Sequence, residues 1–333
     1  MNICIVKLSA MGDIVHAMVV LQYIKAKYKN AKISWIVEQN FQDILKDNQY
    51  VDNILPVNLK SIKTNKLNIF RQISLLKSFH KYKFDIIIDA QGLLKSAIVS
   101  KIISKASHDC CIFGFDKNST REGMSALFYN KKVKISYDTN VILRNTHLFN
   151  EALNLNTTTQ DINNKQCLWS LKRQNNQTYV LLVVGASKPN KIYTKEMFRK
   201  VCDGLEYDIK VVWANDYEKS VANYLSRYCK NVTKLKKLTI RQLIQTIANS
   251  ALVIGGDTGP THMAWGLNRP SLTIYGNTPH QRNSYTTAIN QTISSSSKVH
   301  ANSLNKDDFS IKEIDPNTII SKTYEILGEF KTN

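Results

Sequence analysis

Short runs of β-branched residues alternate with longer amphipathic stretches along this chain, and this alternation is the strongest constraint on its fold. Before residue 150, strands are expected at 2–8, 32–37, 53–57 and 85–89, and helices at 14–28, 67–82 and 96–104. After residue 178, strands are expected at 179–184, 209–213, 252–254 and 271–275, and helices at 195–205, 220–230, 239–249, 261–267 and 315–330. Such alternation is typical of parallel sheets covered by helices. The sequence therefore predicts an α/β protein with two doubly wound domains.

The length of the chain agrees with two domains. At 333 residues it is too long for one small core, and 43% of its residues are apolar. Residues 156–178 are rich in Asn, Thr, Gln and Lys, and are predicted to link a first domain over 1–155 to a second over 179–314. In such domains, the expected ligand cleft lies at the carboxyl ends of the strands.

The charge balance is strongly basic. The chain has 45 Lys and Arg against 26 Asp and Glu, a formal net charge of +19 to which both halves contribute. A basic surface attracts phosphates of nucleic acid, an anionic membrane or a phosphorylated substrate, and charge alone does not choose among them. No stretch approaches about 18 consecutive apolar residues, so any membrane contact is expected to be peripheral.

Cysteine and histidine do not occur in metal-binding patterns. None of the six cysteines forms a C-x-x-C pair, and there is no H-E-x-x-H motif. P-loop and G-x-S-x-G motifs are also absent. Without a secretion signal, reduced thiols in the cytoplasm are expected. Neither a metal nor a cofactor is predicted.

Two turns after predicted strands carry candidate functional residues. Segment 9–13 (SAMGD) puts Asp13 at the carboxyl end of the first strand, either as a functional carboxylate or as a helix cap. Segment 255–262 (GGDTGPTH) has three glycines in five residues, which let the backbone approach a ligand. Its N–H groups and helix dipole are suited to a diphosphate. An ordinary glycine-rich turn, capped by Thr258 or Thr261, is the alternative.

A third turn and a basic segment complete the candidates. Small residues at 185–187 (GAS) leave room for phosphate, and Lys191 is able to neutralise it, with Lys188 as a rival. Seven basic residues follow the third strand: Lys60, Lys63, Lys66, Arg71, Lys77, Lys81 and Lys83. They either bind the phosphates and carboxylates of an anionic acceptor or form a solvated face.

Four longer segments occur in order over nearly the whole chain: KLSAMGDIVHAM at 7–18, DAQGLLKSA at 89–97, TREGMSALFYNKK at 120–132 and GGDTGPTHMAWGL at 255–267. Together they resemble the bacterial lipopolysaccharide heptosyltransferases of glycosyltransferase family 9, in particular the first-heptose kind, heptosyltransferase I. The resemblance implies a GT-B fold with two Rossmann-like domains facing across a central cleft, and a C-terminal helix over 315–333 that returns to the first domain. It also implies inverting transfer of L-glycero-D-manno-heptose from ADP-heptose to the first Kdo sugar of Kdo2-lipid A.

The resemblance also implies roles for single residues. Asp13 is the expected catalytic base, which takes the proton of the acceptor hydroxyl. The expected donor-binding residues are Ser187, Lys191, Glu218, Leu238, Asp257, Thr258, Gly259 and His262. The expected acceptor-binding residues are Lys60, Lys63, Lys66, Gln91, Lys95 and Arg121.

This chain departs from the family pattern at several of these sites. Ser187 stands at a usual threonine and keeps the hydroxyl, whereas Ala186 stands at another and does not. Leu238 replaces a methionine near the adenine and keeps an apolar contact. In the basic loop, Ser61 and Thr64 occupy positions that are often basic in the family.

The expected partners are ADP-heptose, Kdo2-lipid A and an anionic membrane surface, without nucleic acid. A cytoplasmic monomer held peripherally at the inner membrane by its basic first domain is the expected state. The alternatives are heptosyltransferase II or a related member with a different acceptor, a sugar-nucleotide epimerase of similar fold, and a basic nucleic-acid-binding protein. Net charge is the only support for the last.

Overall fold

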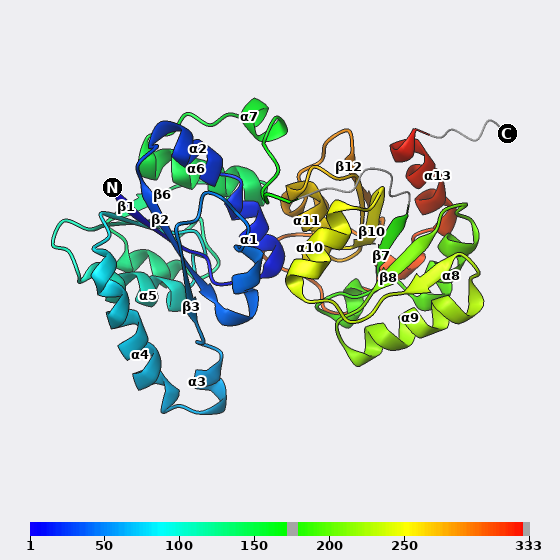
Figure 1. Ribbon diagram of the computed structural model, residues 1–333, viewed down its shortest axis with the longest axis horizontal. Coiled ribbons are helices and arrows are strands. Elements are labelled where there is room, and N and C mark those ends of the chain that lie inside the picture. Colours follow the sequence, from blue (N-terminus) through cyan, green and yellow to red (C-terminus); the bar gives the residue numbers. More distant parts are fainter. Residues whose placement is uncertain (172–178, 329–333) are drawn as a thin grey trace. The chain divides into compact units, whose positions relative to one another are not determined.

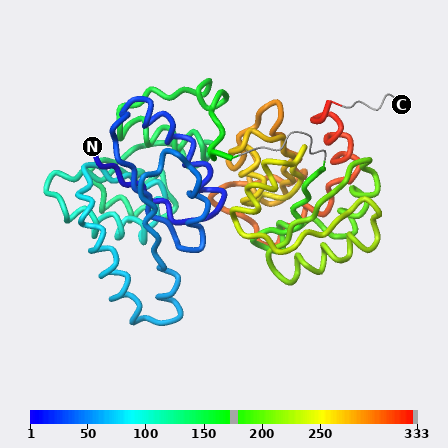
Figure 2. The backbone as a smooth tube through the Cα atoms, viewed as in Figure 1, coloured from blue at the N-terminus to red at the C-terminus, as the bar shows by residue number. Residues whose placement is uncertain are grey.

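The computed structural model describes residues 1–171 and 179–328 and has two compact units (Figure 1). The first unit comprises Met1–Ser170 and the second Leu171–Asn333. Each contains a six-stranded parallel sheet with helices packed on it and its own hydrophobic core, and Figure 2 traces the backbone through both. The predicted α/β class with two doubly wound sheets is confirmed.

The first sheet places the start of the chain at its centre. Its strands, in spatial order, are β3 (Asn53–Val57), β2 (Lys32–Glu38), β1 (Asn2–Val6), β4 (Ile86–Asp89), β5 (Cys111–Phe115) and β6 (Lys131–Val133). Residues 3–6 of β1 are fully buried, because helices cover both faces of the sheet. This burial explains why β1 reads as a continuous apolar run rather than an alternating one.

The helices of the first unit pack in pairs. They are α1 (Met11–Met18), α2 (Leu21–Lys27), α3 (Ser61–Thr64), α4 (Asn68–Ser78), α5 (Leu94–Ser104), α6 (Val141–Leu153) and α7 (Thr159–Asn163). Helix α1 packs against α6, and α4 against α5, and Figure 1 shows these two pairs on opposite faces of the sheet. A short helix over Gly123–Phe128, η3, also packs on α5.

The second sheet is wound in the same order as the first. Its strands, in spatial order, are β12 (Asn290–Ser294), β11 (Ser271–Tyr275), β10 (Leu252–Gly256), β7 (Val180–Val183), β8 (Ile209–Val212) and β9 (Val232–Lys234). Its helices are α8 (Lys195–Asp203), α9 (Asp216–Tyr228), α10 (Ile240–Ala248), α11 (Gly259–Gly266), α12 (His280–Asn283) and α13 (Pro316–Leu327). In each unit the chain winds from the centre to one edge, returns, and winds to the other edge. Ligands of such sheets bind where the winding reverses, here at the carboxyl ends of β1 and β4 and of β7 and β10.

Several elements differ from the sequence prediction. The helix expected at 14–28 is interrupted at Val19 and Val20, whose β-branched side chains have low helix propensity. Strands β5, β6, β9 and β12 and helix α6 were not predicted. Asn140 is the N-cap of α6, and its side chain accepts a hydrogen bond from the Ile142 N–H (3.0 Å).

The first unit extends further than predicted. Part of the expected linker, 156–170, belongs to this unit because it forms α7 and buries Ile162 and Trp169. The Trp169 indole N–H donates to the Ile44 carbonyl (2.7 Å). The remaining linker residues, 172–178, lie outside the described residues.

The C-terminal helix α13 falls in segment 315–333, for which the resemblance implies a return to the first domain. Helix α13 packs against α8 and β11 within the second unit. Its Ile319 and Tyr324 join the core of that unit, and the Tyr324 hydroxyl accepts a hydrogen bond from the Glu206 N–H (3.0 Å). Residues 329–333 lie outside the described residues. Among the described helices, none has the length and apolar character needed to span a bilayer.

Candidate functional site

Asp13 lies near the start of α1, just after the carboxyl end of β1. Its Oδ2 accepts a hydrogen bond from the Ala10 N–H (3.1 Å), and the side chain is half-buried. Ala10 has no side-chain oxygen, so the reciprocal bond of a capping box cannot form. The N-terminal end of the helix dipole also favours a negative charge here. Asp13 therefore caps the helix through one oxygen while its carboxylate stays partly accessible.

Gln91 and Asp89 hold the turn before α1 in place. Gln91 Oε1 accepts hydrogen bonds from the N–H groups of Leu8 and Ser9 (both 3.0 Å). Asp89 is fully buried and accepts from the Gln91 N–H (2.9 Å) and the Tyr129 hydroxyl (2.8 Å). Burial raises the pKa of Asp89, although these hydrogen bonds oppose the rise. Both residues thus support the turn from inside the unit.

Glu38 is a buried carboxylate at the same sheet edge that no sequence motif marks. It ends β2, is 2% exposed, and its Oε1 has no hydrogen-bond partner among the described residues. The backbone of Leu59 and Lys60 favours the charged form of the carboxylate. Burial raises the pKa of Glu38, while the charges of Lys95 and Lys60 oppose the rise. Two predicted acceptor-binding lysines therefore act electrostatically on one buried carboxylate.

We expect Glu38→Gln to change the pH dependence of stability. When the pKa of a carboxyl is higher in the folded chain than in the unfolded chain, the protein loses stability as pH rises from the unfolded pKa through the folded pKa. Glutamine has nearly the same shape and does not titrate, so the variant should gain stability relative to wild type as pH rises from about 4, the ordinary pKa of a glutamate, toward neutrality. Urea unfolding across this pH range measures the difference. Glu196→Gln, at an exposed carboxylate, is the control, and a pH-independent loss of stability in Glu38→Gln would contradict the prediction.

The predicted acceptor loop surrounds the short helix α3. Lys60, Lys63 and Lys66 are all exposed, and the Lys60 ammonium lies 5.2 Å from the centre of the Phe41 ring. A hollow of about 390 Å³ beside the loop is lined by residues of 39–42, β3, α3 and α4, including Arg71. The loop therefore presents exposed cations next to a polar hollow, which suits a phosphorylated or carboxylated sugar.

Lys95 and Arg121 belong to two segments that the structure joins. The Glu122 carboxylate accepts a hydrogen bond from the Leu94 N–H (2.7 Å) at the start of α5. This bond brings the turn of Arg121 to the helix end that carries Lys95, and both cationic side chains are exposed. Of the predicted acceptor residues, Gln91 and Lys95 thus follow the carboxyl end of β4, and Arg121 follows that of the neighbouring strand β5.

In the second unit, Asp257 is the centre of a polar network directly after β10. Its Oδ2 lies 3.0 Å from the Lys191 ammonium, and its Oδ1 lies 3.1 Å from His262 Nε2. The Lys191 and Asp257 side chains are only 15% and 10% exposed. Three more side chains donate to this carboxylate: Tyr275 (3.4 Å), Thr278 (3.1 Å) and Asn283 (3.1 Å).

This network keeps Asp257 ionised. Burial alone would raise its pKa, but the hydrogen bond from His262 and the charge of Lys191 outweigh burial and hold the pKa well below its ordinary value. The network also separates the two rival lysines, since Lys188 is exposed whereas Lys191 is bound at the turn. Lys191 is therefore the cation that the fold fixes next to the glycine-rich segment.

The glycines of this turn allow close packing beneath it. A Cβ at Gly255 would lie 2.7 Å from Val183 Cβ, so only glycine fits between the two central strands. Thr258 is the N-cap of α11, and Gly259 is its first residue. Thr258 thus occupies the cap position, but its hydroxyl makes no cap hydrogen bond to the helix and donates to the Gly256 carbonyl instead (3.4 Å). The same geometry leaves the first N–H groups of α11 at the carboxyl end of β10.

The Glu218 carboxylate, from the first turn of α9, lies next to the turn at 185–187. A Cβ at Gly185 would lie 2.1 Å from Glu218 Oε1, so this glycine makes room for the carboxylate. Glu218 also accepts hydrogen bonds from the Ala214 N–H and the Asn215 amide (both 2.7 Å). Ser187 is exposed on the turn, and Leu238 is half-buried just before α10. The predicted donor-binding residues thus follow four different strands of the second sheet.

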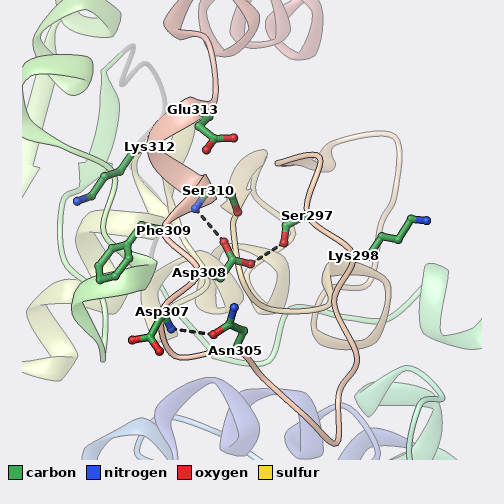
Figure 3. A pocket seen from close by; sticks show the side chains of 9 residues that line it. All are labelled: Ser297, Lys298, Asn305, Asp307, Asp308, Phe309, Ser310, Lys312 and Glu313. Carbon is green, nitrogen blue, oxygen red and sulfur yellow. Dashed lines mark hydrogen bonds between the residues drawn. The ribbon is translucent and has the colours of Figure 1, made fainter.

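A separate hollow of about 550 Å³ lies in the same unit, and its lining residues all fall between 297 and 313 (Figure 3). Its central carboxylate, Asp308, already accepts hydrogen bonds from the Ser297 hydroxyl (2.6 Å) and the Ser310 N–H (2.9 Å). These bonds lower the pKa of Asp308. The lining does not include the predicted donor residues, and the carboxylate is committed to holding its own loop.

Comparison with known proteins identifies the class of this fold and site. The family model of glycosyltransferase family 9 (heptosyltransferase) matches residues 72–312. The lipopolysaccharide heptosyltransferase 1 of Campylobacter coli is 34% identical over 99% of this chain and 100% of its own length. That of Escherichia coli K12 is 28% identical over 84% of this chain and 88% of its own length. The chain belongs to glycosyltransferase family 9 and is a glycosyltransferase of the heptosyltransferase I type.

A solved structure supports the fold. Escherichia coli heptosyltransferase WaaC with ADP aligns over 98% of this chain and 100% of its own, with a TM-score of 0.81 and 23% sequence identity. The GT-B fold implied by the resemblance is therefore confirmed. The family assignment also favours a transferase over the epimerase and nucleic-acid-binding interpretations.

Proposed function

We propose that this protein transfers L-glycero-D-manno-heptose from ADP-heptose to the first Kdo sugar of Kdo2-lipid A, with inversion at the anomeric carbon. Full-length similarity to heptosyltransferase 1 is the observation that carries the proposal. A solved relative, Escherichia coli heptosyltransferase WaaC with ADP-2-deoxy-2-fluoro heptose, supports the choice of donor. Heptosyltransferase II remains the alternative within the family, and it differs in the acceptor.

The first unit would supply the base and bind the acceptor. The Asp13 carboxylate takes the proton of the attacking hydroxyl as this oxygen bonds to the anomeric carbon and ADP departs. An ordinary aspartate is a weak base, so proton transfer is expected late, when the attacking oxygen has become acidic. Five cationic side chains, together with Gln91, would neutralise and orient the anionic acceptor: Lys60, Lys63, Lys66, Lys95 and Arg121.

The second unit would bind the nucleotide. Lys191, fixed by Asp257, and the N-terminal end of α11 at Thr258 and Gly259 would stabilise the diphosphate as negative charge develops on it. His262, Ser187, Glu218 and Leu238 are the other proposed donor-binding residues. No step of this scheme requires a metal. We further propose that the protein works at the cytoplasmic face of the inner membrane, as a monomer, without nucleic acid.

The proposal is tested by ADP release from ADP-heptose with purified protein, in the presence and absence of detergent-dispersed Kdo2-lipid A. We expect release that depends on the acceptor, and a product whose mass increases by one heptose. Release only with an acceptor that already carries one heptose would assign the protein to the second transfer. A folded protein that binds ADP but transfers to neither acceptor would contradict the proposed function.

We expect Lys60→Ala with Lys63→Ala to weaken acceptor use selectively. A lost hydrogen bond to a charged group costs about 1.5–3 kcal/mol, so KM for Kdo2-lipid A should rise about 10-fold or more while affinity for ADP stays unchanged. Steady-state kinetics and calorimetry measure the two effects. Lys101→Ala with Lys105→Ala, two exposed lysines of the same unit, is the matched control. Equal losses for both ligands would contradict the assignment of the loop.

A further inference from the structure

The segment that carries the basic loop also exposes large apolar side chains. Leu67 and Phe70 are each 70% exposed, and Ile69 next to them is 43% exposed. Leu67 is the N-cap of α4, and Phe70 follows three residues later on the same side of the helix. The opposite side of α4 is used for packing, through buried Gln72 and Leu76. The outward apolar pair is therefore not part of the core.

Charge in this segment is completely segregated. Between Asp52 and Asp85 the sequence contains no acidic residue and seven basic ones: Lys60, Lys63, Lys66, Arg71, Lys77, Lys81 and Lys83. All seven are exposed, and Lys66 and Arg71 flank Leu67 and Phe70 directly in the sequence. Solvated protein surfaces normally mix both signs of charge with few exposed aromatic residues. A cationic surface with projecting leucine and phenylalanine has the composition of an interfacial membrane anchor.

The shape of the first unit agrees with this use. Figure 1 shows α3 and the start of α4 projecting from the unit, away from its sheet, and the backbone trace in Figure 2 shows the same extension. The projecting tip carries Leu67 and Phe70, while Leu55 and Val57 of β3 at its base remain packed in the core. A tip of this kind is able to enter the headgroup region without disturbing the sheet that holds Asp13.

We propose that residues 60–71, termed here the α3–α4 tip, dock on an anionic phospholipid surface, with Leu67 and Phe70 inserted at the headgroup boundary and the exposed Arg71 beside them facing lipid phosphates. The proposal rests on the proposed function in one respect, because a protein docked on the bilayer would reach a lipid-anchored acceptor while that acceptor stays in the membrane. Cations alone give weak and salt-sensitive attraction, whereas inserted apolar side chains add binding that salt does not remove. The tip thus combines the two kinds of attraction that stable peripheral binding requires.

The test compares full-length wild type with Leu67→Ser/Phe70→Ser by co-sedimentation with vesicles of phosphatidylethanolamine and phosphatidylglycerol. We expect the double variant to bind at least about 10-fold more weakly, because two large apolar groups no longer enter the interface. The matched control is Leu304→Ser/Phe309→Ser, which removes the same pair of residue types from exposed positions of the second unit. The control should bind vesicles like wild type.

Activity is measured in parallel with an acceptor from which the acyl chains have been removed, so that no lipid surface is present. We expect the tip variant to transfer heptose to this soluble acceptor at the wild-type rate, which also shows that it is folded. Equal vesicle binding by wild type and the tip variant, or no binding by wild type, would overturn the proposal and leave the proposed function standing. Vesicle binding that depends on the tip, in a protein without transferase activity, would support the docking surface and overturn the proposed function instead. A wild-type dimer that the double substitution dissociates, with vesicle binding unchanged, would assign the tip to a second copy of the chain and overturn lipid docking.

Discussion

Asp13→Asn should lower the turnover of heptose transfer by about 10²–10⁴-fold, the usual contribution of a general base. The asparagine oxygen is still able to accept the hydrogen bond from the Ala10 N–H, so the start of α1 keeps its cap. The substitution therefore removes the charge and basicity of the side chain while keeping its structural bond. Turnover is measured by ADP release at saturating donor and acceptor.

Asp13→Ala provides the comparison for the capping role. It should lose turnover to the same extent and, in addition, lose about 1 kcal/mol of stability with the cap. ADP affinity should be unchanged in both variants, since the proposed nucleotide residues belong to the second unit. Wild-type turnover in Asp13→Asn would show that the carboxylate is only a cap, and the base would then have to be sought elsewhere.

Asp257→Asn should destabilise the protein by about 3 kcal/mol at neutral pH, because it leaves buried Lys191 without its counter-charge. The pKa of Asp257 lies lower in the folded chain than in the unfolded chain. Its contribution to stability is therefore fully present above the unfolded pKa, about 3.9, and is lost as pH falls toward the folded pKa. The difference between variant and wild type should accordingly shrink as the solution is acidified below this value. Urea unfolding of the full chain at several pH values measures it.

Asp307→Asn is the control for this change, because Asp307 is an exposed carboxylate of the same unit. It should alter stability by less than about 0.5 kcal/mol. The same variants test the nucleotide site, since a Lys191 side chain that is no longer oriented should bind ADP more weakly. A stable Asp257→Asn protein with normal ADP affinity would mean that the network is dispensable for both roles.

The sequence was a good guide to the elements that lie at the centre of each sheet. Strands β1, β4, β7 and β10 are short, apolar and bounded by turns, so their pattern is unambiguous. Strands β5 and β6 were missed because each is short and its pattern is polar or interrupted by glycine. Part of the region predicted to be a linker belongs to the first unit for a related reason. Its composition is mostly polar, and the burial of Ile162 and Trp169 depends on tertiary contacts that the local sequence does not indicate.

The residues of the candidate site also divide into those that a local sequence pattern marks and those that only the tertiary fold brings together. Turn chemistry made Asp13 and the 255–262 segment visible, because glycine and a capping residue after a strand form a local pattern. Local sequence left Lys188 as a rival of Lys191 and only the family resemblance chose Lys191, whereas in the structure the position of Asp257 distinguishes them. Glu38 was not predicted, because no local sequence pattern marks it. It is a single acid at the end of a strand, and its importance comes from Lys60 and Lys95, which approach it from elsewhere in the chain.

The presence of a separate core in each unit has a consequence for how such enzymes diversify. The apolar clusters of the two sheets share no residue, so a substitution that repacks one of them does not require compensation in the other. In the proposed function, the first unit binds the acceptor and the second binds the nucleotide-sugar, so acceptor-binding residues are able to change without repacking the core that supports the donor site.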